Sequence, residues 1–204
     1  NVSNLDTDSG TVEYNGTGSY ATLPYTGNYY NINFTGSGSY TLPTSLTALN
    51  DFTLNGSTIT APSGTLTVAG DFTNTSGTFT HNSGTLSLNG TGQTVSGNTS
   101  FNNFTKTTSS ADTLTFTASS TQTIAGTLTL QGASGNLLTL VSSSPATRWN
   151  IVNTGDTESV SYVDVQDSNN TGSTITAVDS TNSGNNVGWT FPSSGQITIT
   201  GTIY

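Results

Sequence analysis

Short runs in which apolar and small polar residues alternate are the feature that most constrains the fold of this chain. Leu66 and Val68, for example, alternate with Thr65 and Thr67. The same alternation recurs around Phe79, in the run Leu86-Ser87-Leu88, and in residues 113–117, 127–130 and 197–203. A period of two indicates β-strands with one buried and one wet face. The helical spacing of apolar residues is nowhere sustained, so we expect an all-β protein.

Pairs of small residues separate these runs. They read Ser-Gly, Asn-Gly, Gly-Ser or Thr-Gly, and they repeat along the chain. Gly and Asn tolerate positive φ, and Ser and Asn side chains bond to nearby backbone, so such pairs favour turns. We therefore expect very short strands that are joined by tight corners.

The corner residues also mark an internal repeat. Ser-Gly-Thr begins at Ser9, Ser63, Ser76 and Ser83, and SGTVEYNGTG from Ser9 matches SGTLSLNGTG from Ser83. Repetition with the same corner residues predicts a solenoid, in which stacked coils bury one continuous apolar core. With roughly 20 residues per coil the chain makes about ten coils, a rod of roughly 45 Å. The alternative is an antiparallel β-sandwich, which also has alternating strands and frequent turns.

The charge balance excludes several classes of partner. The chain has 2 Lys and Arg residues against 11 Asp and Glu, a net charge of −9. Phosphate binding needs several cationic side chains, so we expect no nucleic-acid partner. There is no cysteine for a disulfide or a thiolate metal site, and no apolar run long enough to insert into a membrane.

Three long segments, residues 77–106, 113–151 and 160–191, resemble parts of large, repetitive, secreted surface proteins of bacteria. They begin GTFTHNSGTLSLNGTG, TLTFTASSTQTIAG and VSYVDVQDSNNTG. The resemblance implies a right-handed parallel β-helix (β-solenoid) that ends near Trp189, together with an extracellular or cell-surface location. It carries no catalytic motif.

The chain divides into three parts on this interpretation. Residues 1–62 form a Tyr-rich N-terminal part of the solenoid or a cap, and residues 63–191 form the repetitive β-helix. Residues 192–204 form a linker and an extra C-terminal strand, which is the stub of a next domain or an arm that pairs with a neighbouring copy. The assembly residues on that strand would be Gln196, Ile197, Ile199, Ile203 and Tyr204. Because the chain opens on Asn1, we expect it to be processed or excised.

Acidic residues gather toward the end of the chain and are the first candidates for chemistry. They are Asp156, Glu158, Asp164, Asp167 and Asp179. Paired carboxylates serve glycosidases, and carboxylate and amide oxygens suit Ca²⁺. Only Lys106 and Arg148 could help to hold a sugar, and no calcium-loop motif is present. We therefore expect carboxylates that cap turns, no catalytic residues, and no cofactor beyond a weak signal for Ca²⁺.

The remaining candidates are His81, the aromatic residues and the threonine pairs. His81 is the one histidine and lacks the partners of a metal site or a catalytic triad, so we expect a corner side chain. Tyr25, Tyr29, Tyr30 and Trp149 could stack on sugars but more often fill a core. Thr-x-Thr pairs begin at Thr65, Thr78, Thr113, Thr127 and Thr198, and stacked pairs of this kind form ice-binding faces. Their spacing along the chain is irregular.

Together these patterns predict a non-enzymatic structural module of a cell-surface stalk, an adhesin or a self-assembling filament. Its partners would be copies of itself or neighbouring domains of a longer surface protein, with glycans as a further candidate. The alternative is a carbohydrate- or ice-binding β-solenoid.

Overall fold

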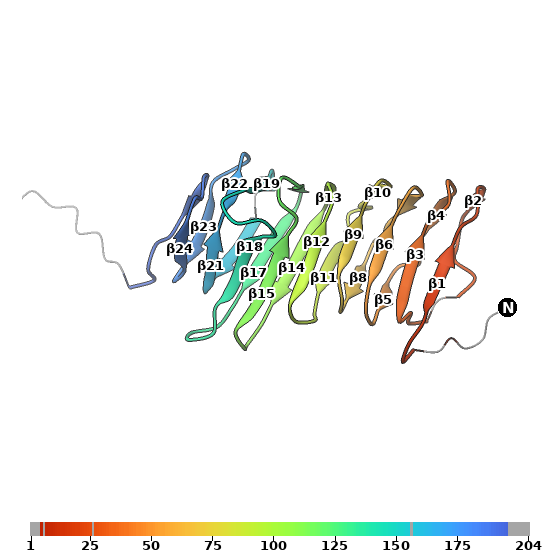
Figure 1. Ribbon diagram of the computed structural model, residues 1–204, viewed down its shortest axis with the longest axis horizontal. Coiled ribbons are helices and arrows are strands. Elements are labelled where there is room, and N and C mark those ends of the chain that lie inside the picture. Colours follow the sequence, from red (N-terminus) through yellow and green to blue (C-terminus); the bar gives the residue numbers. More distant parts are fainter. Residues whose placement is uncertain (1–4, 6, 26, 156, 196–204) are drawn as a thin grey trace, which may run out of the picture.

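The protein is a parallel β-helix of about nine turns (Figure 1). The computed structural model describes residues 5, 7–25, 27–155 and 157–195, and no helix occurs in this part of the chain. A full turn runs along a first face, across a third face and back along a second face before the next turn starts. The first turn has no named strand on the second face, and the last has none on the third face. The predicted parallel β-helix is therefore confirmed.

The first face is sheet A and the second is sheet C. Sheet A contains β1 (Thr11–Tyr14), β3 (Asn31–Phe34), β6 (Phe52–Leu54), β9 (Phe72–Asn74), β12 (Gln93–Ser96), β15 (Asp112–Phe116), β18 (Leu138–Ser142), β21 (Val163–Gln166) and β24 (Thr181–Gly184). Sheet C contains β5 (Leu46–Ala48), β8 (Thr65–Val68), β11 (Thr85–Leu88), β14 (Asn103–Thr107), β17 (Thr127–Gln131), β20 (Thr157–Ser161), β23 (Ile175–Val178) and β25 (Trp189–Thr190).

The third face consists of two shorter sheets placed one after the other along the rod. Sheet B contains β2 (Ser19–Tyr20), β4 (Ser39–Thr41), β7 (Thr58–Thr60) and β10 (Thr78–Thr80). Sheet D contains β13 (Thr99–Phe101), β16 (Thr121–Ile124), β19 (Trp149–Asn153) and β22 (Ser168–Asn170). Among the described strands, β10 and β13 are the sheet ends that face each other.

Strands pair with the strand one turn away and not with their neighbours in sequence. Ile32 pairs with Phe52 and Phe52 with Phe72, so these turns take 20 residues each, as the repeat predicts. Later turns are longer, since Leu114 pairs with Leu140. The antiparallel β-sandwich is wrong, because the corners turn the chain onto a new face and do not reverse it onto the previous strand.

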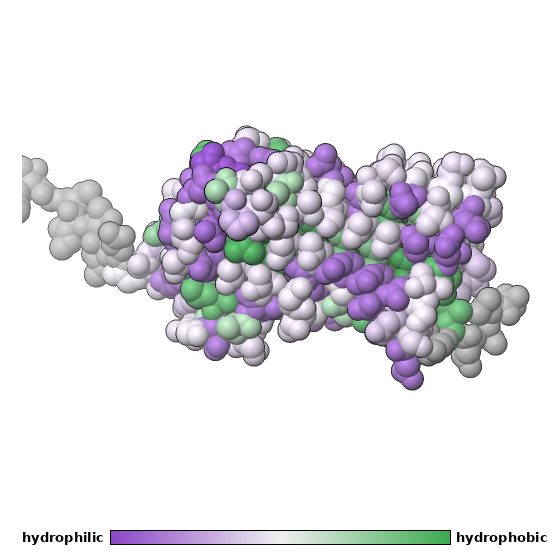
Figure 2. All heavy atoms as spheres, viewed as in Figure 1, coloured by the Kyte–Doolittle hydropathy of each residue, from purple (hydrophilic) through white to green (hydrophobic). Residues whose placement is uncertain are grey.

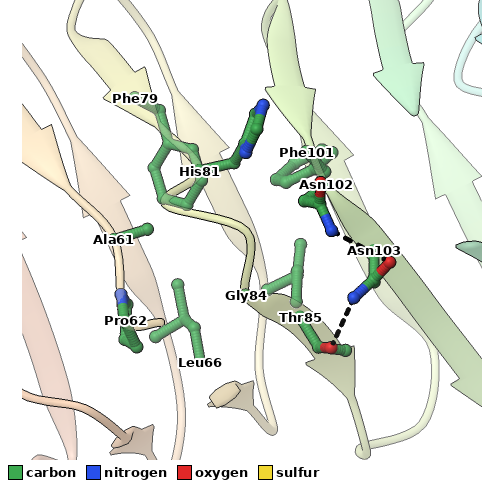
Figure 3. Close-up of a pocket in the computed structure, with 11 residues that line it drawn as sticks. Ala61, Pro62, Leu66, Phe79, His81, Gly84, Thr85, Phe101, Asn102 and Asn103 are labelled. Atoms are coloured by element: carbon green, nitrogen blue, oxygen red, sulfur yellow. Dashed lines mark hydrogen bonds between the residues drawn. The ribbon is translucent and has the colours of Figure 1, made fainter. Parts of the chain in front are cut away.

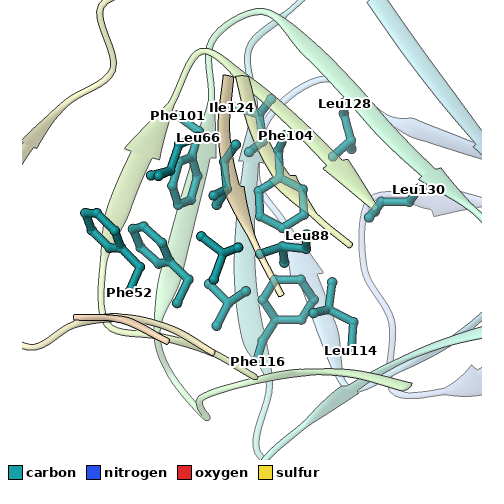
Figure 4. Close-up of a cluster of buried hydrophobic side chains, with 14 of the residues drawn as sticks. Phe52, Leu66, Leu88, Phe101, Phe104, Leu114, Phe116, Ile124, Leu128 and Leu130 are labelled. Carbon is teal, nitrogen blue, oxygen red and sulfur yellow. The ribbon is translucent and has the colours of Figure 1, made fainter. Parts of the chain in front are cut away.

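Side chains that point inward form one core along the rod. Leu66, Leu86, Phe104 and Leu128 follow one another in register on sheet C, and all four are buried. Aromatic rings, including Phe52, Phe101 and Phe116, run beside them (Figure 4). Phe52 and Phe72 stack with centroids 5.4 Å apart. Because each turn buries its apolar stripe only against its neighbours, the core depends on stacking along the whole rod.

Polar side chains at the corners fasten each turn to the next. Asn31 Oδ1 accepts the Asp51 N–H at 3.1 Å, Asp51 Oδ1 accepts the Asp71 N–H at 2.8 Å, and Asp71 Oδ1 accepts the Thr94 N–H at 2.7 Å. Each of these side chains therefore adds one hydrogen bond to the ladder where a strand begins. This corner chemistry explains why Asn, Asp and Ser accumulate between the strands.

Two further expectations concern the ends of the chain and membranes. The predicted assembly residues 196–204 lie outside the described residues, so the C-terminal strand stays a prediction. Within the described part, no helix is long and apolar enough to cross a membrane.

Candidate functional site

The described acidic residues near the C-terminus have separate hydrogen-bond partners. Asp164 Oδ1 accepts a hydrogen bond from Ser183 Oγ on the outer face of sheet A. Asp167 is buried at a corner, where it accepts bonds from the Ala146 N–H and the Asn185 side chain. Asp167 therefore serves as a turn cap, which is the role that we expect of these carboxylates.

The other acidic candidates also bond to backbone. Glu158 Oε1 accepts the Thr176 N–H at 2.8 Å, and Asp179 Oδ1 accepts the Ser194 N–H at 2.7 Å. The Ser194 N–H lowers the pKa of the Asp179 carboxyl below its usual value. Asp156 lies outside the described residues. Within the described residues no group of three or more His, Cys, Asp or Glu side chains is placed to hold a metal ion.

His81 lies at the corner that follows β10. Its Nδ1 accepts the Ser83 N–H at 3.3 Å, within a tight turn in which Asn82 and Ser83 have φ of 47° and 59°. The hollow beside it, between Phe79, Phe101 and Asn102, measures about 10 Å³ (Figure 3). That volume admits about one water molecule, so it is too small for an organic ligand.

This hollow lies on a gap in the hydrogen bonding of the third face, which we call the seam. On one side is β10, the last strand of sheet B, and on the other is β13, the first strand of sheet D. Phe79 and Phe101 contact each other across the seam with ring centroids 5.6 Å apart. Apolar contact therefore joins the two sheets where the strand ladder is interrupted.

A buried polar cluster occupies the corner opposite the seam. It consists of Gln93, Lys106 and Asp112, and we call it the Lys106 cluster. Lys106 Nζ lies 2.8 Å from Asp112 Oδ2 and donates to Gln93 Oε1 at 2.9 Å and to the Gly90 carbonyl. The side chains of Lys106 and Asp112 are 1% and 4% exposed.

The strand register explains how a lysine enters the core. Lys106 pairs with Leu88 on one side and with Leu130 on the other, so it occupies an inward position in an aliphatic column. Alternation from the buried Phe104 places it there. Sequence reasoning treated Lys106 only as a scarce cation for a sugar, although this period-two signal was available.

The bonds around Asp112 decide its charge. Burial alone would raise the pKa of its carboxyl, but the bonds from Lys106 and from the Gly92 and Thr113 N–H groups lower the pKa below its usual value. The Asp112 carboxyl is therefore ionised at neutral pH. Such a cluster orders a corner and offers no free nucleophile, because Lys106 is fully engaged.

The outer face of sheet C carries the most regular surface pattern. One column of hydroxyl side chains continues in register over six strands: Thr47, Thr67, Ser87, Thr105, Thr129 and Ser159. In Figure 2 the visible surface of the molecule is mainly white and purple, the colours of residues with intermediate or hydrophilic hydropathy. We call this column the sheet C ladder.

The sequence alone did not sort the Thr-x-Thr pairs by face. The pairs beginning at Thr65 and Thr127 lie on sheet C, whereas Thr78 begins a pair on sheet B and Thr113 a pair on sheet A. The pair beginning at Thr198 lies outside the described residues. Irregular spacing along the chain therefore conceals a regular column on one face.

Most of the aromatic candidates fill the core. Trp149 is fully buried, stacks on Phe116 with centroids 4.0 Å apart, and donates its Nε1–H to the Gln166 carbonyl. Tyr29 is buried too. Its burial is the main cause that raises the pKa of its hydroxyl, and its hydrogen bond with Tyr14 raises that pKa further. Tyr25 and Tyr30 are partly exposed.

Tyr20 is an exposed aromatic that sequence reasoning missed. It is 41% exposed and stacks on Tyr40 with centroids 4.8 Å apart, beside a hollow of about 220 Å³. The stacked pair follows from the 20-residue repeat, which brings β2 and β4 into register.

The chain matches no protein-family model, no curated protein and no solved structure at a significant level.

Proposed function

We propose that this protein is a non-enzymatic structural module of the cell exterior, a rod segment of a surface stalk, an adhesin or a filament. The observation that carries the proposal is the unbroken order of sheet A, in which each strand from β1 to β24 pairs in parallel with the strand one turn away. A solenoid of this kind has rigidity along one axis and a length that scales with the number of turns.

The source of stability fits an exposed mechanical role. Charged residues make up 6% of the chain, so stability rests on ladder hydrogen bonds, corner side chains and a stacked core. Ladders and apolar burial are less sensitive to salt than surface ion pairs are. A rod of this composition keeps its stability when the ionic strength of its surroundings changes.

The ends of the rod support assembly with copies or neighbouring domains. Among the described strands, β1 and β24 are the two ends of sheet A, and each has one partner strand. A strand edge without a partner is a template for pairing with another chain.

Electron microscopy of the native material tests this proposal. We expect rods, stalks or filaments in which the strands lie across the long axis. Compact single particles with no lengthwise assembly would overturn the proposal.

The sheet C ladder favours ice binding as a second candidate function. Hydroxyl groups repeat on it at the strand spacing, about 4.8 Å, and the four threonines of the column add methyl groups. Thermal hysteresis measured at high protein concentration tests this candidate, with Thr67→Lys and Thr129→Lys as interrupting substitutions and Thr53→Lys on sheet A as the matched control. Absence of hysteresis in the parent protein removes it.

The exposed Tyr20 beside its hollow favours glycans as a further partner class, since sugar rings stack on aromatic faces. A glycan array tests this candidate with Tyr20→Ala as the comparison. Equal glycan signals for the parent protein and the variant would exclude Tyr20 as a glycan-binding residue.

A further inference from the structure

We propose that the rod contains a joint between its fourth and fifth turns. The third face opens at the seam between β10 and β13, while the opposite corner, held by the Lys106 cluster, acts as the hinge. A joint gives the module one defined place at which it bends, which a uniform rod does not have.

Isolated bridges included, the boundary between these two turns has fewer register pairs than any other boundary between described turns except the one before the last turn. On the third face β10 and β13 belong to different sheets. On sheet A, β9 and β12 share only two register pairs, Phe72 with Val95 and Thr73 with Ser96. Sheet C stays continuous there, with four register pairs between β11 and β14. Backbone hydrogen bonding across this boundary is therefore concentrated on sheet C. On the third face, side chains at the two ends of the seam cross it: Asn74 Nδ2 donates to the Asn98 carbonyl and to Thr99 Oγ1, and Asn102 Nδ2 donates to the Ser83 carbonyl.

Aromatic contacts close the seam. Phe101 contacts Phe79 at 5.6 Å and Phe72 at 5.2 Å between ring centroids. Phe79 is partly exposed, whereas Ile59, its register partner in the preceding turn, is fully buried. Apolar contacts are non-directional, so the rings can slide and separate over small distances. Wider opening breaks the bonds from Asn74 Nδ2 to the Asn98 carbonyl and to Thr99 Oγ1.

The opposite corner is fastened by directional bonds through three successive turns. Gln93 Nε2 donates to the Val68 and Gly70 carbonyls of the corner before it, and Gln93 Oε1 accepts from Lys106. Lys106 in turn holds Asp112, which begins the next turn on sheet A. Charge-assisted bonds of this kind are about twice as strong as neutral ones, and they prefer one geometry.

The cross-section sets the direction of bending. A turn passes from sheet A to the third face and then to sheet C, so the corner from sheet C back to sheet A lies opposite the third face. Because the Lys106 cluster fixes that corner, separation of β10 from β13 makes the third face the convex side of a bent rod.

Distance measurements between paired spin labels test the joint directly. The chain has no cysteine, so two introduced cysteines are labelled without interference. The pair Ser39→Cys and Ser100→Cys straddles the seam, and the pair Ser19→Cys and Thr78→Cys lies within sheet B. All four positions are exposed, and each pair is three turns apart, roughly 14 Å along the rod.

We expect a broader distance distribution for the pair that straddles the seam than for the pair within sheet B. Equal widths would overturn the joint. Amide hydrogen exchange gives a label-free check, since Phe79 and Ser100 should exchange faster than Ile59 and Thr123 on the same face. Equal exchange at these positions would also contradict the proposal.

Replacement of the cluster tests the hinge. The combination Lys106→Met with Asp112→Asn removes both charges and keeps similar volumes. We expect it to widen the distribution of the pair across the seam and to leave the pair within sheet B unchanged. Asn170→Ala, which removes a buried corner side chain far from the seam, is the matched control. Equal widening of both pairs, or no widening, would overturn the hinge role.

Discussion

Lys106 Nζ and the Asp112 carboxylate lie 2.8 Å apart inside the solenoid, and both side chains are almost completely buried. The chain has few charged residues, yet two of opposite charge lie in the core, where the loss of hydration of a charged group is most unfavourable. A buried ion pair contributes little net stability against an apolar replacement, but loss of one partner is strongly destabilising. This asymmetry leads to the first prediction.

Lys106→Ala should destabilise the protein far more than removal of both charges. The single substitution leaves the Asp112 carboxylate buried without its counterion, and we expect a loss of about 3–5 kcal/mol in the free energy of unfolding. The double variant Lys106→Met with Asp112→Asn should lower the free energy of unfolding clearly less than Lys106→Ala does. Denaturant unfolding measures both, and equal losses would contradict the account of the cluster.

The lowered pKa of Asp112 predicts an acid-sensitive component of stability. A carboxyl whose pKa is lower in the folded than in the unfolded state adds stability above the unfolded pKa of about 4, and this stability is lost as the pH falls through the folded pKa. We therefore expect constant stability from this group near neutral pH and a decline below about pH 4. Asp112→Asn should flatten that decline.

Salt separates Asp112 from surface carboxyls with the same direction of shift. The Ser194 N–H also lowers the pKa of Asp179, but this carboxyl is exposed to solvent and its contribution is screened. At high ionic strength the acid-dependent component that Asp112→Asn removes should persist. Its disappearance in salt would show that surface groups produce the decline.

Leu128→Ala tests the stacked core. Leu128 is fully buried on sheet C, in register with Phe104 (Figure 4). We expect the substitution to lower the free energy of unfolding by about 2–5 kcal/mol. Thr129→Ala, on the outer face of the same strand, is the control and should lose less than about 1 kcal/mol. Similar losses at the two positions would mean that the assigned inner and outer faces are wrong.

Close contact between corners predicts a second site of low tolerance. A Cβ added at Gly155 would lie 1.6 Å from the Gly126 carbonyl oxygen of the preceding turn, whereas one at Gly195 would meet nothing within 4 Å. Gly155→Ala should therefore lower the melting temperature by several degrees, and Gly195→Ala should leave it unchanged. Thermal unfolding followed by circular dichroism compares the two variants.

The sequence predicts the strands well because burial follows a period of two. Leu86 and Leu88 are buried as the alternation predicts, and the 20-residue repeat sets the early turns. Phe79 was expected inside and packs against the core, yet it stays partly exposed because the ladder is interrupted beside it. The alternation of apolar and polar residues predicts the faces of one strand. It does not predict whether the strand of the next turn forms a hydrogen-bonded ladder with it.

The arrangement of the surface and the buried cluster could not be predicted in the same way. Thr65 and Thr78 begin similar pairs close together in the chain, but two corners place them on different faces. Gln93, Lys106 and Asp112 meet only because two successive corners stack in register, and corner lengths vary between turns. Their contacts depend on the path of the whole coil and not on any local pattern.

Fibre diffraction from oriented native material tests the central claim, that the protein works as a rod built from stacked turns. The account predicts a reflection at about 4.8 Å along the long axis of the assembly, because the strands lie across that axis. Native material that does not assemble lengthwise, or a reflection of about 4.8 Å perpendicular to the axis, would contradict it.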